Sequence, residues 1–385
     1  MFNLNLKKIA ALILVTTLAA CGASNSDDSP VASVTLTETA TLTPTQEVVE
    51  TASLATGSGT LAMNSSSGAI AGSVTTAGVT ATAAHIHVGA AGVNGAIIVG
   101  LVADPATPGK WNVPAGATLI KEQQDAFIAG NLYFNVHSAA FPGGEIRGQI
   151  GREVALARLS GVQEVEQNTS GGFGLGVISL DPDTKMADVT LTFADVLPTA
   201  AHIHTAVIGA NGPITFPLGS PTANKYALSK VAFTDAQIAD FRAKRLYFNL
   251  HSATLPAGEI RGQIGYQVRI ASMTGAQENP PVITASTGRG FFAYDPEAKN
   301  AFGALTVSGF TPVAGHIHRG AVGINGPVIV GLKQDATVLQ KWATDGLVPF
   351  ADADALLFMT GGTYLNAHSA AFSGGEVRGQ LTNNK

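Results

Sequence analysis

The segment HIHVGAAGVNG at residues 85–95 returns as HIHTAVIGANG at 202–212 and as HIHRGAVGING at 316–326. The three copies begin 117 and 114 residues apart, and a near-constant period indicates one structural unit used several times. Each copy ends in Asn-Gly, which predicts a tight type I′ turn because both central residues of that turn need a positive φ angle. We therefore expect three copies of one unit of about 115 residues.

Two further motifs keep nearly the same spacing. The first is an aromatic block that runs on into Gly-Glu-(Ile/Val)-Arg-Gly-Gln, and it reads LYFNVHS at 132–138, LYFNLHS at 246–252 and TYLNAHS at 363–369. The second is a Gln-Glu pair that opens each unit, at residues 46–47, 163–164 and 277–278. Together the motifs predict repeat units at 34–151, 152–266 and 267–385.

The composition favours short strands over long helices, with 45% hydrophobic residues, 13% charged residues and 44 glycines in 385. Turn-forming segments at 64–68, 181–185 and 295–299 lie at matching places between strand-like runs, as hairpin connections do. A short helix is expected after Thr234, which has the character of an N-cap. We predict an all-β protein of three tandem antiparallel β-sandwiches, with a small barrel as the alternative.

The N-terminal residues read as an export signal rather than as part of the fold. A pair of lysines precedes an apolar stretch, Ile9–Ala20, that is too short to span a bilayer comfortably. The stretch ends in Leu18-Ala-Ala-Cys21, which resembles a bacterial lipobox, the site where a cysteine is acylated and becomes the mature N-terminus. We predict a signal peptide at 1–21, acylation of Cys21, and a flexible tether at 22–33.

Localisation and partners follow from the same features. Gly22 follows the cysteine, where an Asp would resemble the inner-membrane retention signal, so we expect an outer-membrane lipoprotein of the bacterial envelope. Cys21 is the only cysteine, which excludes a disulfide framework and a thiolate site. The net charge of −5, without a basic run beyond the leader, disfavours nucleic acid. The expected partners are the membrane, through the lipid anchor, a metal ion, and an extracellular or envelope protein.

The three motifs together resemble the CHRD domain, which is named from chordin and occurs in many bacterial exported proteins. The resemblance covers essentially everything after the tether, in three copies. It implies an immunoglobulin-like or superoxide-dismutase-like β-sandwich, and it implies little about biochemical role. The second copy departs from the pattern, with Ala206 where the others have Gly89 and Gly320, and with the third histidine 47 rather than 50 positions after the second. The equivalence of its site is therefore open.

All nine histidines lie in these motifs, three in each unit. Side chains two residues apart on a strand share a face, so His85 and His87 project together. In the second block the apolar residues Leu132 and Phe134 take one face and leave His137 on the other. If the two strands are neighbours, three neutral imidazoles converge, a ligand set that suits Cu or Zn with an open fourth position. We predict about one Cu or Zn ion per unit, held by His85, His87, His137, His202, His204, His251, His316, His318 and His368.

Polar residues near the third histidine of each unit are candidates to orient the imidazole rings. They are Tyr133, Asn135, Glu145, Tyr247, Asn249, Glu259, Tyr364, Asn366 and Glu376. For the three glutamates, an ion pair with the arginine two residues further along the strand, or with a cross-strand partner, is the favoured interpretation.

Three functions fit these motifs, and we favour the first. The chain is a binding protein with a metal ion in each unit, or a structural or adhesive array whose histidines form only hydrogen-bonded clusters, or a superoxide-dismutase-like enzyme. The enzyme is disfavoured because the dinuclear site of copper-zinc superoxide dismutase needs more histidines and an Asp. Ser138 lies on the strand face opposite to that of its neighbour His137, which disfavours a Ser-His catalytic pair. No catalytic residue is predicted.

Overall fold

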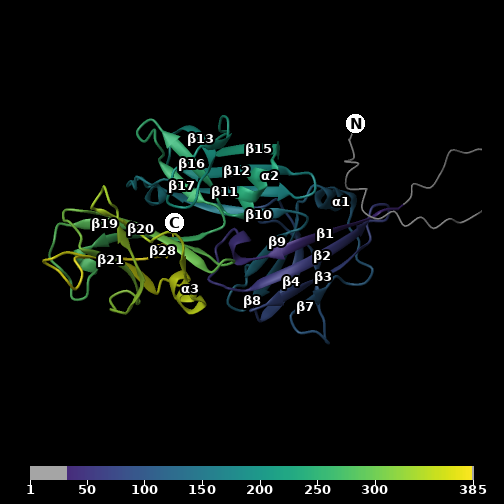
Figure 1. Ribbon diagram of the computed structural model, residues 1–385. Helices are drawn as coiled ribbons and strands as arrows, with labels where there is room; N and C mark the ends of the chain where they lie inside the picture. Colours follow the sequence, from purple (N-terminus) through teal and green to yellow (C-terminus); the bar gives the residue numbers. More distant parts are fainter. Residues whose placement is uncertain (1–32, 384–385) are drawn as a thin grey trace, which may run out of the picture. The chain divides into compact units, whose positions relative to one another are not determined.

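The computed structural model describes residues 33–383. The predicted signal peptide at 1–21, the acylation site Cys21 and the tether up to residue 32 lie outside the described residues. Strands dominate the described chain, and the α-helices are short (Figure 1). Within residues 33–383, no helix combines the length and the apolar character needed to cross a membrane.

The first repeat is a sandwich of two antiparallel sheets. Its strands are β1 (Thr35–Leu42), β2 (Thr56–Asn64), β3 (Ile70–Ala77), β4 (Ala81–Val88), β5 (Ile97–Gly100), β6 (Val102–Ala103), β7 (Lys110–Asn112), β8 (Leu132–Ser138) and β9 (Ile146–Gln149). One sheet has the order β1-β2-β3-β7-β6 and the other the order β5-β4-β8-β9. A backbone bridge between Thr43 and Arg147 links an edge of each sheet.

The second repeat joins its eight strands in one continuous sheet. They are β10 (Glu153–Ser160), β11 (Phe173–Asp181), β12 (Met186–Ala194), β13 (Pro198–Thr205), β14 (Ile214–Pro217), β15 (Lys225–Ala232), β16 (Leu246–Ser252) and β17 (Ile260–Gln263). The order is β14-β13-β16-β17-β10-β11-β12-β15. Ser160 pairs with Arg261 where β10 meets β17, which matches the Thr43–Arg147 bridge of the first repeat.

The third repeat extends this pattern. Its strands are β18 (Gln267–Thr274), β19 (Thr287–Asp295), β20 (Asn300–Ser308), β21 (Ala314–Arg319), β22 (Val328–Gly331), β23 (Lys333–Gln334), β24 (Lys341–Ala343), β25 (Val348–Pro349), β26 (Thr363–His368), β27 (Val377–Gln380) and β28 (Thr382–Asn383). The main order is β22-β21-β26-β27-β18-β19-β20-β24-β23, while β25 pairs with β20 and β28 with β18. Thr274 pairs with Arg378 at the joint between β18 and β27.

The core of the first repeat lies between its two sheets. Leu61 of β2, Ile86 of β4 and Phe134 of β8 are fully buried in one apolar cluster. Because successive side chains of a strand point to opposite faces, the neighbours His85 and His87 of Ile86 point away from this core. The predicted all-β sandwich architecture is confirmed in each of the three repeats.

One short α-helix precedes the histidine-bearing strand of the second motif in each repeat. These helices are α1 (Lys121–Ile128), α2 (Asp235–Arg242) and α3 (Asp352–Met359). The helix predicted after Thr234 is confirmed, because Thr234 Oγ1 accepts a hydrogen bond of 3.2 Å from the backbone N–H of Gln237, and Gln237 Oε1 accepts one of 2.8 Å from the N–H of Thr234. This reciprocal capping box satisfies backbone donors that a helix start leaves unpaired. A 3₁₀-helix contains or borders each Gln-Glu pair, at Pro44–Gln46, Gly161–Gln163 and Gly275–Gln277.

The predicted hairpins at residues 64–68, 181–185 and 295–299 are confirmed. In the second, Asp181 Oδ1 accepts hydrogen bonds from the backbone N–H groups of Asp183 and Thr184, which closes the turn between β11 and β12. Short Asn and Asp side chains favour turns because they can accept such bonds from the next residues.

The type I′ turn predicted from Asn-Gly is wrong. Neither Asn94 nor Gly95 has a positive φ, and in this loop, which runs from β4 to β5, the positive φ of 74° belongs to Gly92. Gly95 is needed for a different reason, since a Cβ atom there would lie 1.6 Å from the carbonyl oxygen of Val88. The motif therefore marks a longer loop, from residue 89 to 96, that folds back closely onto the end of β4.

The internal contacts of the chain divide it into two compact units. Of the described residues, one unit contains 33–43, Ala55–Glu153 and Leu180–Met186. The other contains Pro44–Leu54, Val154–Ser179 and residues 187–383. Segment Pro44–Leu54, which joins β1 to β2, thus belongs to the unit that holds the third repeat and most of the second.

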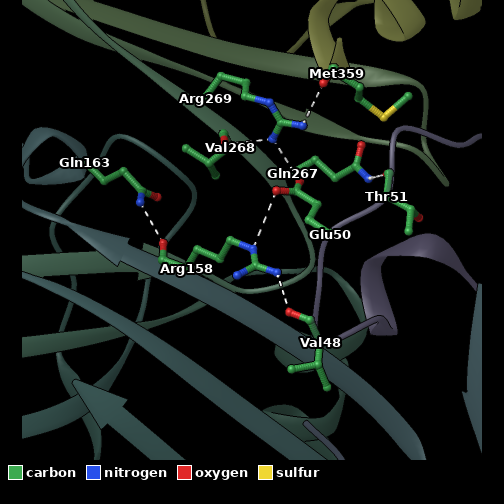
Figure 2. Close-up of polar contacts among 9 residues, drawn as sticks. All are labelled: Val48, Glu50, Thr51, Arg158, Gln163, Gln267, Val268, Arg269 and Met359. Atoms are coloured by element: carbon green, nitrogen blue, oxygen red, sulfur yellow. Dashed lines mark hydrogen bonds and ion pairs between the residues drawn. The ribbon is translucent and has the colours of Figure 1, made fainter. Parts of the chain in front are cut away.

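An ion-pair cluster fixes Pro44–Leu54 within that unit, as Figure 2 shows. Glu50 lies 2.9 Å from Arg269 of β18 and 3.5 Å from Arg158 of β10. Backbone carbonyls add to the contact, because Val48 accepts a hydrogen bond from Arg158 and Thr51 accepts one from Gln267. The Arg269 side chain is only 2% exposed, so Glu50 neutralises a buried positive charge.

Candidate metal centre

The three histidines of the first repeat lie on two neighbouring strands. Strands β4 and β8 are antiparallel, with His85 opposite Asn135 and His87 opposite Tyr133, and a register shift near the start of β4 places Ala83 opposite His137. The equivalent pairs are β13 with β16 and β21 with β26. The strand pairing on which the predicted convergence depends is therefore present in all three repeats.

The imidazole nitrogens are close enough to share an ion. In each repeat one nitrogen from each of the three rings lies within 4.8 Å of the others. Nδ1 of the first histidine lies within hydrogen-bond distance of Nε2 of the third, at 3.0 Å for His85 and His137. In a tetrahedral site with metal–nitrogen bonds of about 2.0–2.1 Å, the ligand atoms lie roughly 3.3–3.4 Å apart, so the most widely separated nitrogens need to close by about 1.4 Å at most.

Backbone carbonyls fix the tautomer of two rings in each triad. Nδ1 of His87 lies 3.0 Å from the carbonyl oxygen of Gly95, and Nδ1 of His137 lies 3.0 Å from that of Pro142. A carbonyl only accepts hydrogen bonds, so Nδ1 carries the proton and Nε2 keeps its lone pair. The same contacts join His204 to Gly212, His251 to Pro256, His318 to Gly326 and His368 to Ser373.

The second histidine of each triad has a buried nitrogen without a partner. Nε2 of His87, of His204 and of His318 is buried and has no hydrogen bond. A buried polar atom left unpaired costs about 1–3 kcal/mol, so native proteins rarely keep one without a reason. A metal ion bound to this lone pair would satisfy the atom, and the residues present therefore fit a metal.

Burial keeps all nine rings in the neutral form that coordination needs. Desolvation lowers the pKa of each histidine below its ordinary value of 6.5. For His85 the neighbouring His137 lowers the pKa further, because two imidazolium charges repel each other. Neutral imidazole is the ligand form for Cu and Zn, so no proton has to leave these rings near pH 7.

A stack of three side chains supports the second ring of each triad. The ring of Tyr133 lies parallel to that of His87, with centroids 4.8 Å apart, and the guanidinium carbon of Arg147 lies 3.5 Å from the Tyr133 centroid. The Tyr133 hydroxyl also accepts a hydrogen bond of 3.0 Å from the N–H of Gly95. Tyr247 and Tyr364 repeat this stack with His204 and His318. Tyr133 thus supports the His87 ring by stacking. Its hydroxyl also holds Gly95, whose carbonyl is hydrogen-bonded to that ring.

The arginine of this stack is bound to the loop. Arg147 is 1% exposed and donates hydrogen bonds to the carbonyl oxygens of Ala90 and Val93. Arg261 and Arg378 likewise donate to Ala210 and Ala321. These contacts bring the arginines to the loop over the histidines. In the second and third repeats the arginine does not pair with the glutamate two residues earlier, which was one of the two alternatives favoured from the sequence.

The candidate glutamates and asparagines face a different loop. Glu259 accepts a hydrogen bond of 2.7 Å from Ser170, and Glu376 accepts one of 2.6 Å from Ser286. Asn366 donates to Glu278 of the Gln-Glu pair. In the second and third repeats these groups hold the segment after the Gln-Glu pair and are not the hydrogen-bond partners of the histidines.

The buried glutamate of the Gln-Glu pair was not predicted from the sequence. Burial raises the pKa of Glu164 and of Glu278 to about 7, although the positive charges of Arg261 and Arg378 act in the opposite direction. The carbonyl partners of the histidine rings were not predicted either. The signals available were the constant Gln-Glu spacing and the loop that follows each His-x-His, but neither pattern specifies a contact.

Comparison with known proteins bears directly on these repeats. A family model described as the CHRD domain matches residues 39–150, 156–264 and 270–381. The chain belongs to the CHRD family. Each of the three CHRD domains contains one complete histidine triad. The comparisons found no similar curated protein and no similar solved structure.

Proposed function

We propose that the chain is an exported, lipid-anchored metal-binding protein in which each CHRD domain holds one Cu or Zn ion. The observation that carries the proposal is the buried, unpaired Nε2 of the second histidine, which lies beside two further imidazole nitrogens in every domain. Three neutral imidazoles suit both metals, and a bound ion would keep a fourth position open to a further ligand.

The proposed ligand atoms follow from the hydrogen bonds. In the first domain they are Nε2 of His87, Nε2 of His137 and Nδ1 of His85, because Nδ1 of the first two is already bonded to a carbonyl. The carbonyls of Gly95 and Pro142 would set the ring orientation, and such outer partners typically change metal affinity 10- to 100-fold.

A purely structural or adhesive array is the rival proposal. Hydrogen bonding explains the contact between His85 and His137, which needs only one proton between the two nitrogens. It gives no partner to Nε2 of His87. The metal-binding proposal accounts both for the contact between His85 and His137 and for the unpaired Nε2 of His87, and it is preferred for that reason.

We propose binding rather than superoxide dismutation. Fast dismutation needs positive charge that steers the anion to the metal. The arginine at the equivalent position of each domain is stacked on tyrosine and hydrogen-bonded to loop carbonyls. Arg319, next to His318, is paired with Asp354. We expect the copper-loaded protein to be no faster, per metal, than a simple copper–histidine complex.

The location rests on the N-terminal motif. The basic pair, the apolar stretch and Leu18–Cys21 support a lipid anchor and a place in the bacterial outer membrane. Cys21→Ser tests the anchor, because the unacylated protein should move from the membrane fraction to the soluble envelope fraction. Unchanged membrane association of this variant would contradict the proposal.

Metal stoichiometry tests the binding function. After loading with Cu(II) or Zn(II) and gel filtration, elemental mass spectrometry should find about three ions per chain, and His318→Ala should remove one. Arg319→Ala is the matched control, since it alters the adjacent exposed side chain outside the triad. Fewer than one retained ion per chain, or an equal loss in both variants, would favour the structural array.

A further inference from the structure

The loop over the second triad controls the orientation of His204. This loop, residues 206–212, places the carbonyl of Gly212 3.0 Å from Nδ1 of His204. Arg261 holds the loop through the carbonyl of Ala210, and Gln263 holds it through that of Ala206. If the loop opens, His204 loses the hydrogen bond that keeps Nε2 aimed at the other two imidazoles.

The same loop packs against the third CHRD domain. Ile208 is 7% exposed and belongs to a buried cluster with Tyr266, Val268, Phe291, Ala293 and Phe302. Phe291 is next to Phe292 on β19, and Phe302 is next to Ala301 on β20. Phe292 and Ala301 belong to the core of the third domain. Phe291 and Phe302 therefore lie on the outer face of its sheet, and the loop of the second site covers them.

Close approach of backbone and ring shows how tight this contact is. A Cβ atom at Gly209 would lie 2.3 Å from Cζ of Phe302, so only glycine fits at this point of the loop.

A second contact involves the segment after the Gln-Glu pair of the second domain. Glu166 lies 2.6 Å from Lys341, and Arg289 donates a hydrogen bond of 3.0 Å to the carbonyl of Gln167.

The third domain has the same loop without the cover. Val322 lies four residues after His318, as Ile208 does after His204, yet it is 77% exposed against 7% for Ile208. Within the triad the two sites agree, because Nδ1 of His318 lies 2.9 Å from the carbonyl of Gly326. The second and third sites thus share their ligands and differ in what packs on the loop.

We propose that docking of the third domain on this loop regulates the second metal site by slowing the release of its ion. The inference rests on the proposed metal-binding function. Release requires the imidazoles to leave the ion, and the docked loop opposes the movement of His204. Where docking also raises the equilibrium affinity of the second site, linkage makes that change in affinity reciprocal, so an ion at the second site stabilises the docked arrangement of the two domains by the same factor.

Matched loop variants test the inference in the full chain. One parent protein carries His87→Ala and His318→Ala and therefore retains only the second site. The other parent carries His87→Ala and His204→Ala and retains only the third site. Transfer of Zn(II) to a chromogenic chelator measures release. Ile208→Ser should speed release from the second site roughly tenfold, and Val322→Ser should leave release from the third site unchanged. Equal effects of the two substitutions would show that the loop acts without docking and would overturn the inference.

A second variant acts from the other side of the contact. Phe302→Ala lies in the third domain but should speed release from the second site and not from the third. Hydrogen exchange without metal gives an independent measurement, because residues 206–212 should be better protected than 320–326, and Phe302→Ala should remove the difference. Equal protection in the parent protein contradicts docking control.

The outcomes separate this inference from the proposed function. If neither parent variant retains zinc after gel filtration, the metal-binding function fails and the inference fails with it. If both parents retain zinc and release is unchanged in Ile208→Ser and in Phe302→Ala, the inference alone fails. Circular dichroism of each variant establishes that it is folded before release is measured.

Discussion

Replacement of Arg378 by methionine should loosen the loop over the third triad. The guanidinium is 1% exposed and donates hydrogen bonds to Ala321 O at 2.9 Å, Ile324 O at 3.0 Å and Asn325 Oδ1 at 3.2 Å. Its central carbon also lies 3.5 Å from the centroid of Tyr364. Methionine has a similar length and fills much of the space, so the substitution mainly removes the charge and the donors.

The expected loss is about 3 kcal/mol. Removing one partner from a buried charged network costs about 3–5 kcal/mol, and hydrogen bonds to charged groups contribute roughly 1.5–3 kcal/mol each. The lower end applies because the loop carbonyls are only partly buried and regain water when the loop opens. At 1.4 kcal/mol per factor of ten, the loop over residues 320–326 should open roughly a hundredfold more often.

Hydrogen exchange and zinc release measure the effect of Arg378→Met. Exchange should accelerate in residues 320–326, and zinc should leave the third site faster, because Gly326 no longer holds His318. Arg319→Met is the control, since its side chain is 46% exposed and an exposed ion pair contributes about 1 kcal/mol or less. If both variants exchange alike, the arginine stack does not hold the loop and the reasoning is refuted.

Three further predictions concern pH and charge. The lowered histidine pKa values mean that the unfolded chain takes up protons more readily, so the metal-free protein should lose stability as pH falls below about 6.5, in urea titrations at several pH values. Burial raises the pKa of Glu278 to about 7. The stability that its protonated side chain contributes is therefore present below about pH 4.5 and is lost as pH rises through 7. Glu278→Gln should remove this pH-dependent loss, which is on the order of 3 kcal/mol between pH 5 and 8. Glu50→Gln leaves the charge of Arg269 buried and should destabilise the protein by about 3–5 kcal/mol, whereas Asp345→Asn in an exposed pair should change stability by less than about 1 kcal/mol in the same denaturation assay.

The architecture and the convergence of three histidines in each repeat were predictable because they depend on periodicity. Spacing revealed the three repeats, and the two-residue alternation of a strand placed His85 and His87 on one face before any pairing was known. The pairing of β4 with β8 was an assumption at that point, and the structure supplies it.

The surroundings of the triads were not predictable, because they depend on loops. Every residue has a carbonyl, so nothing in the sequence distinguishes Gly95 and Pro142 as the partners of the imidazoles. The Asn-Gly pair suggested a two-residue turn, but the loop is longer and its positive φ lies at Gly92. Arg261 looked like a partner for Glu259 because spacing reports only that two side chains share a face. The loop that approaches this face decides which acceptors the arginine meets.

The three protons of a neutral histidine triad cannot give every imidazole nitrogen a hydrogen-bond partner, which favours a metal site over a hydrogen-bonded cluster. With all rings neutral, His87 donates its one proton to Gly95 and His137 donates its proton to Pro142. His85 can then donate its proton from Nδ1 to Nε2 of His137, and no proton remains for Nε2 of His87. A fourth proton would create an imidazolium ion, which burial and the neighbouring rings disfavour by lowering the pKa of His87. A metal ion gives this nitrogen a partner, because it uses the lone pairs of all three rings and needs only that the proton of His85 move from Nδ1 to Nε2.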